Sequence, residues 1–163
     1  MGKSNDSKRF NLLLCLCILI PILAGVSSLL VYMFGSGIKN PYESFKNLFS
    51  VSYNSPTPIF WAWFIMYPLM GYVCYRIVNQ KDRKRTAALS IYVLQLVFNV
   101  LWMPMMFEGW FMISAIWLFV LVCLIAILIM FTWKIRKGAA LLLLPYLVLC
   151  LIALFFNGHI ALE

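Results

Sequence analysis

The sequence predicts an all-α fold, an integral membrane bundle of five transmembrane helices with the N-terminus inside and the C-terminus outside. First, 64% of the 163 residues are apolar and only 11% are charged, which excludes a water-soluble domain of ordinary composition. Second, the apolar residues form five runs of about the length that crosses a bilayer. Third, the basic residues gather in alternate connecting segments. The whole chain, 1–163, is therefore expected to form one transmembrane domain.

The first span is expected at 12–34, after a polar and basic N-terminal segment. A basic segment before an apolar run is also typical of a signal peptide, and the small residues around Gly25 suit a cleavage site. The run continues past them to 23 residues, a length that favours a span. A long outer loop, 35–58, follows, because glycine and proline recur through it.

The other four spans are expected at 59–78, 87–107, 110–133 and 139–156. A short basic loop separates the second span from the third, and a tight turn at Glu108 and Gly109 separates the third from the fourth. Residues 157–163 are expected to form a short tail. No segment is left over for a separate soluble domain.

The distribution of basic residues predicts the orientation of the spans. Eleven of the thirteen Lys and Arg residues fall on one side of the predicted membrane, and only Lys39 and Lys46 fall on the other. Because short cytoplasmic segments carry an excess of Lys and Arg, the basic side should be inside. The net charge of +8 is thus explained by membrane topology, and we expect no nucleic-acid partner.

The third span carries a polar stripe. Gln95, Asn99 and Trp102 are spaced i, i+4 and i+7, so they share one face of a helix. An amide without a partner costs a few kcal/mol in hydrocarbon, so this face should look into protein or a wet cavity. Two readings stay open: the amides join helices through hydrogen bonds, or they form the polar wall of a ligand cavity.

The second and fifth spans bring further candidates to the same depth. At about 1.5 Å per residue, Trp63 and Tyr67 lie at roughly the depth of Trp102 and Asn99, and Ala153 lies close to them. If the two aromatic faces meet, they enclose a cavity in the outer half of the bundle, beneath the long loop. The alternative is that these tryptophans belong to an interfacial aromatic belt.

Three of the predicted spans carry sequence motifs. The second span carries one at Trp63, Tyr67, Leu69, Met70 and Gly71. The third span carries another at Gln95, Leu96, Asn99, Trp102, Pro104 and Phe107. The fifth carries the last at Ala140, Leu142, Leu143, Pro145, Tyr146, Ala153, Asn157 and Ile160. With these three motifs the chain resembles the translocator protein / tryptophan-rich sensory protein family (TspO/MBR), over roughly residues 56 to 160.

The resemblance implies a five-helix bundle, often a homodimer, that binds porphyrins such as protoporphyrin IX or haem, and in some members sterols. It also adds Tyr146 to the candidate site. This sequence departs from the family pattern at several positions. Leu149 stands where the family usually has a tryptophan, and Leu118 appears at the position of a family acid. The departure at Leu149 weakens the transfer of any porphyrin-degrading activity.

We therefore expect a membrane protein that binds a porphyrin or haem for sensing, sequestration or transport, with sterol as a second ligand class. The expected ligand-binding residues are Trp63, Tyr67, Gln95, Asn99, Trp102, Tyr146 and Ala153. No obligatory cofactor is expected. A single histidine and cysteines without a C-x-x-C pair predict no metal site, and a lone Glu108 offers no paired-carboxylate catalysis.

Two alternatives stay open, a light- or oxygen-dependent porphyrin-degrading enzyme and a structural membrane partner without a ligand. The sequence favours a binding protein over either. The expected partners are the lipid bilayer, a small hydrophobic ligand and a second copy of the chain. The expected location is a bacterial cytoplasmic membrane, because no organelle signal is found, and the mitochondrial outer membrane is the alternative.

Overall fold

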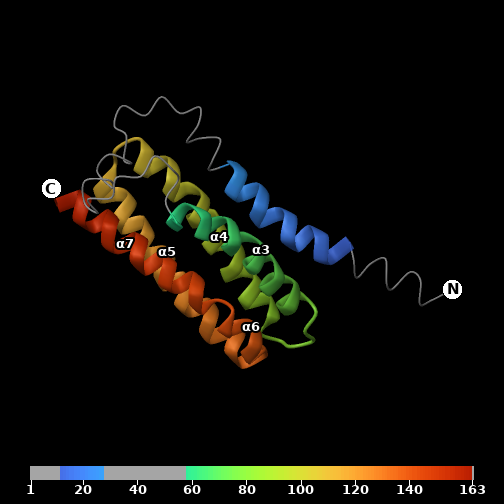
Figure 1. The fold of residues 1–163 in the computed structure, drawn as a ribbon. Helices are drawn as coiled ribbons and strands as arrows, with labels where there is room; N and C mark the ends of the chain where they lie inside the picture. The colour runs from blue at the N-terminus through green and yellow to red at the C-terminus, as the bar shows by residue number, and fades with distance from the viewer. Residues whose placement is uncertain (1–11, 28–57, 163) are drawn as a thin grey trace.

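The computed structural model describes residues 12–27 and 58–162. Within these residues the chain is helical apart from short turns, so the prediction of an all-α fold is confirmed. An N-terminal helix, Leu12–Ser27, precedes the labelled helices in Figure 1. These are α3 (Pro58–Val78), α4 (Arg85–Phe107), α5 (Phe111–Ile135), α6 (Lys137–Leu141) and α7 (Leu144–Leu162). The remainder of the first predicted span, 28–34, and the long loop as far as residue 57 lie outside the described residues.

Three described helical stretches are long and apolar enough to cross a membrane: Arg85–Met106, Phe111–Ile135 and Lys137–Leu162. Two shorter apolar helices, Leu12–Ser27 and Ile65–Val78, lie beside them. This architecture is that of a membrane helical bundle. The count of five spans and their orientation stay predictions.

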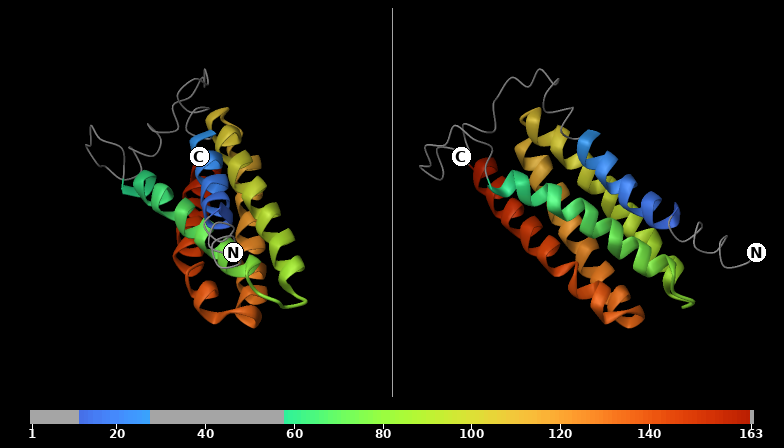
Figure 2. Two further views of the ribbon diagram at one scale, coloured as in Figure 1. Left: turned by 90° about the vertical axis from the view of Figure 1, so that its right-hand side faces the viewer. Right: turned by 45° about the vertical axis from the view of Figure 1, so that its right-hand side comes forward.

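The connections of the bundle alternate between its two ends. The α3–α4 connection and α6 lie at one end, and the α4–α5 turn and the C-terminus lie at the other (Figures 1 and 2). The basic residues around Arg83 and those around Arg136 therefore share one end of the bundle. The charge pattern predicts this, because it places both loops on the same side of the membrane.

A tight turn joins α4 to α5. The N–H of Glu108 donates to the carbonyl of Pro104, and the N–H of Trp110 donates to that of Met105, both at 3.0 Å. Gly109 between them has a φ of 80°, which a residue without a Cβ adopts at no steric cost. The turn predicted at this position thus ends α4 with a glycine of positive φ, a common way for a helix to terminate.

The C-terminal helix differs from its sequence-based prediction. The predicted span ended at residue 156, whereas α7 continues to Leu162. Asn157, at the start of the predicted tail, is buried and hydrogen-bonded inside the bundle. A single amide with a partner on the facing helix does not end an apolar helix, which is why polarity alone placed the boundary too early.

The core lies between α3, α4, α5 and α7. In α5 the fully buried residues recur three or four positions apart and form one stripe, made by Leu118, Leu121, Ile125 and Leu128. The opposite face is equally apolar but exposed, with Ile116, Phe119 and Met130 all more than half exposed. An apolar outer face is what a helix needs when its surroundings are lipid.

The N-terminal helix packs closely against α3 through glycines. A Cβ added to Gly71 would lie 2.6 Å from the carbonyl oxygen of Cys17, and one added to Gly25 would overlap the Tyr67 ring. Small residues permit such backbone approach between membrane helices. Gly25 thereby brings the N-terminal helix against one of the predicted site residues.

Replacing Gly71 by alanine is expected to lower the thermal unfolding midpoint in detergent, because the new methyl group meets backbone atoms of the N-terminal helix. Overpacking of this kind costs about 1–3 kcal/mol. Gly158→Ala is the matched control, since a Cβ at that helical position would have nothing within 4 Å. Equal midpoints for the two variants would contradict this account of the helix contact.

Candidate functional site

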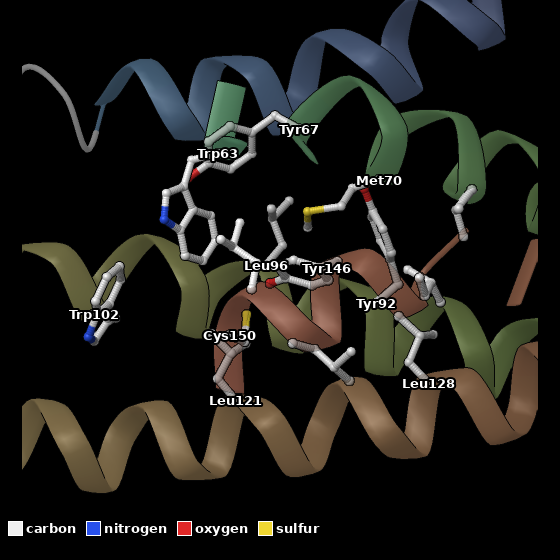
Figure 3. Packing of buried hydrophobic residues seen from close by; sticks show 14 of the residues in the cluster. Trp63, Tyr67, Met70, Tyr92, Leu96, Trp102, Leu121, Leu128, Tyr146 and Cys150 are labelled. Atoms are coloured by element: carbon white, nitrogen blue, oxygen red, sulfur yellow. The ribbon is translucent and has the colours of Figure 1, made fainter. Parts of the chain in front are cut away.

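The structure brings together the seven residues that the sequence predicts as a site. Two come from α3, three from α4 and two from α7, and all are buried: Trp63, Tyr67, Gln95, Asn99, Trp102, Tyr146 and Ala153. Figure 3 shows the Trp63, Tyr67 and Tyr146 side chains directed into the space between these helices. Their spacing explains the convergence, since each set recurs on one face of its helix.

Four of these side chains form one hydrogen-bonded series across three helices. The Tyr67 hydroxyl donates to Asn99 Oδ1 at 3.1 Å, and Asn99 Nδ2 donates to the Tyr146 hydroxyl at 2.9 Å. The Tyr146 hydroxyl in turn donates to Gln95 Oε1 at 2.8 Å. This series satisfies the buried polar groups of α3 and α7 through α4.

The series ends in a donor without an acceptor. Gln95 Nε2 is buried and has no hydrogen-bond partner among the described residues, and the same holds for Trp102 Nε1. Each such orphaned group costs about 1–3 kcal/mol. The site therefore presents two N–H donors that a ligand or water with acceptor oxygens would satisfy.

Aromatic rings surround this series. The Trp63 ring lies 5.8 Å from that of Trp102 and 6.2 Å from that of Tyr146, centroid to centroid, and the second pair is edge-to-face. Tyr67 is a further neighbour of Trp63, at 6.5 Å. Trp63 is thus the centre of an aromatic cluster whose faces and edges suit a flat conjugated ligand.

The space between these rings is narrow in this conformation. The cavity next to the cluster has a volume of about 160 Å³ and lies between the N-terminal helix and α3, beside Tyr67 and Pro68. Ligand pockets usually measure about 300–1,000 Å³. Trp63 and Trp102 pack against each other, so the cavity predicted between the two aromatic faces requires them to separate and stays a prediction.

Ala153 closes the site from α7. It lies two turns after Tyr146 on the same helix face and is buried. Its carbonyl accepts a hydrogen bond from Asn157 Nδ2 at 3.0 Å. Ala153 therefore belongs to the buried core that packs around the aromatic cluster.

Two features near the site escaped the sequence analysis. Cys150, one turn after Tyr146, is fully buried and belongs to the same core cluster. Ser114 of α5 donates to Asn157 Oδ1 at 2.5 Å and so ties α5 to α7. The i, i+4 spacing from Tyr146 to Cys150 was a usable signal, whereas nothing in the apolar run around Ser114 identified its partner.

The side chains of the cluster suit the binding of a ligand through hydrogen bonds and aromatic contacts. Its polar groups are amides, phenols and indoles, which donate and accept hydrogen bonds but remain uncharged near neutral pH. Across residues 12–27 and 58–162, no group of three or more His, Cys, Asp or Glu side chains lies close enough together to hold a metal ion. The arrangement fits the binding of an aromatic molecule with polar edges.

Comparison with known proteins agrees with the motifs. The family model of the TspO/MBR family matches residues 16–162, nearly the entire chain. No curated protein matches the sequence significantly. The family match and the three long apolar helices together make this an integral membrane protein. The chain belongs to the TspO/MBR family.

Proposed function

We propose that this protein binds a flat, largely apolar tetrapyrrole, such as protoporphyrin or haem, between α3, α4 and α7, for sensing, sequestration or transport. One observation carries the proposal: two buried N–H donors without acceptors, Gln95 Nε2 and Trp102 Nε1, border an aromatic cluster. Family membership supports a membrane protein of the ligand-binding or sensing kind.

A porphyrin matches both the aromatic rings of the site and its two N–H donors without acceptors. Its conjugated ring offers two faces for stacking against Trp63 and Trp102 and edges for contact with Tyr146. Its carboxylates offer acceptor oxygens for Gln95 Nε2 and Trp102 Nε1, and hydrogen bonds to an ionised acceptor are about twice as strong as neutral ones. Sterols, the second ligand class, offer a hydroxyl group but no aromatic face.

Binding requires α3 to move away from α4. Pro68 follows Tyr67 directly inside α3, and a proline removes one backbone hydrogen bond from the helix and favours bending there. α3 also crosses the other helices obliquely, as Figure 2 shows in its left view. We propose that bending at Pro68 separates Trp63 from Trp102 and admits the ligand in the outer half of a bacterial cytoplasmic membrane.

Titrating the purified protein with protoporphyrin is expected to give saturable changes in porphyrin absorption, at one ligand per chain. The stacking surfaces and the two donors give the physical reason. A sterol and a vehicle blank are run in parallel. Porphyrin absorption that stays constant under illumination distinguishes binding from degradation. Unsaturable uptake equal to that of empty detergent micelles would refute the proposal.

A further inference from the structure

The face of α4 opposite the aromatic cluster is hollowed. An open groove of about 670 Å³ runs along this helix from the end that carries the α3–α4 connection. It is lined by Val78, Arg85, Thr86, Leu89, Ser90, Val93, Leu94 and Val97. Val93 is two positions from Gln95, about 200° around the helix, so the groove faces away from the aromatic cluster.

The polar end of the groove is built around Arg85. Its Nη1 donates to the carbonyl oxygens of Val78 and Gln80, both at 3.3 Å, which anchors the guanidinium between α3 and α4. A guanidinium has five N–H donors, so donors remain for an anion beyond those of Nη1. Thr86 and Ser90, one turn apart and both exposed, add two hydroxyl groups on the same face.

The charge around this end has one sign. Lys81, Arg83 and Lys84 precede Arg85, and all are exposed. The single acid in this connection is Asp82, whose carboxylate already accepts the backbone N–H of Lys84 at 2.7 Å. An anionic group is therefore favoured here, and a headgroup that carries its own cation is disfavoured.

The rest of the groove is apolar and about as long as one leaflet. Val93, Leu94 and Val97 are 58%, 46% and 47% exposed. Val97 comes twelve residues after Arg85, which is about 18 Å along the helix, against about 15 Å for half of the hydrocarbon core. The groove thus has the polar end and apolar length of a membrane lipid.

We infer that this groove binds an anionic glycerophospholipid. The Arg85 guanidinium receives the phosphate, the Thr86 and Ser90 hydroxyls meet headgroup or glycerol oxygens, and an acyl chain lies along Val93 and Val97. The charge of the connection selects this lipid over a zwitterionic one. The lipid site is independent of the tetrapyrrole site, since the two use opposite faces of α4.

Native mass spectrometry of the full-length protein in neutral detergent tests the inference, with phosphatidylglycerol and phosphatidylcholine of identical acyl chains as probes. We expect phosphatidylglycerol to be retained about tenfold better. Arg85→Gln should reduce that preference severalfold, whereas Lys134→Gln, which removes an exposed charge from α5, should leave it intact. Val93→Trp fills the apolar part of the groove and should reduce the retention of phosphatidylglycerol although every charge is kept. If Arg85→Gln fails to fold, this variant tests whether the lipid occupies the groove.

Three results would overturn the inference. Equal retention of both lipids would remove the charge selection, and equal effects of Arg85→Gln and Lys134→Gln would show only diffuse surface charge. Efficient cross-linking of two Val93→Cys chains in phosphatidylglycerol vesicles would show that a second copy of the protein covers the groove.

Discussion

Trp102→Phe is expected to weaken protoporphyrin binding about tenfold or more, with the helix content unchanged. The substitution keeps an aromatic ring against Trp63, 5.8 Å away between centroids, but removes the indole N–H. That N–H has no acceptor among the described residues, so its loss breaks no hydrogen bond in the free protein. A hydrogen bond to a carboxylate contributes about 1.5–3 kcal/mol, which is the size of the expected loss.

The measurement is a titration followed by porphyrin absorption, because this signal does not depend on the number of tryptophans. Trp133→Phe is the matched control, since Trp133 is exposed and lies near the C-terminal end of α5, at the opposite end of the bundle from Trp102. Removing its N–H should leave the affinity unchanged. If both variants bind protoporphyrin as the parent does, Trp102 Nε1 is no ligand donor and the main support for the proposed function is lost.

Asn99→Leu is expected to destabilise the bundle by about 2–4 kcal/mol. Asn99 accepts from the Tyr67 hydroxyl and donates to that of Tyr146, so its loss breaks two bonds and leaves the Tyr67 hydroxyl buried without an acceptor. Each bond contributes about 0.6 kcal/mol in a membrane, and the orphaned donor about 1–3 kcal/mol more. Chemical denaturation in mixed micelles measures the change.

A double-mutant cycle separates the orphaned hydroxyl from general damage. Adding Tyr67→Phe to Asn99→Leu removes the stranded donor, so the double variant should be more stable than Asn99→Leu alone. Tyr92→Phe is the control, because the Tyr92 hydroxyl is buried without a partner in the described helices and its removal should not destabilise. Additive effects of Tyr67→Phe and Asn99→Leu would mean that the hydrogen-bonded series contributes no coupling.

Part of the site was predictable because helix geometry is local. The i, i+4, i+7 spacing placed Gln95, Asn99 and Trp102 on one face, and depth along the spans brought Trp63 and Tyr67 level with them. All five are buried and adjoining in the structure. Tyr146 entered only through the family resemblance, because neither spacing nor composition relates a tyrosine in the fifth span to an amide in the third.

The two readings of the amides were left open by the sequence, and the structure contains elements of both. Asn99 joins α3 and α7 through hydrogen bonds, as in helix association. Gln95 Nε2 and Trp102 Nε1 are left over, as in a polar wall that awaits a ligand. Which amide does which depends on the positions of two phenols on other helices, and local patterns do not encode those positions.

Apolar run length, charge distribution and motif spacing are properties of single segments, so they were enough to identify an all-helical membrane protein of the TspO/MBR family. The packed helices were needed to learn that Trp63 fills the space beside Trp102, that α7 continues to Leu162 and that Arg85 is anchored beside an open groove. These features arise where side chains of different helices meet, and their geometry follows from packing between segments.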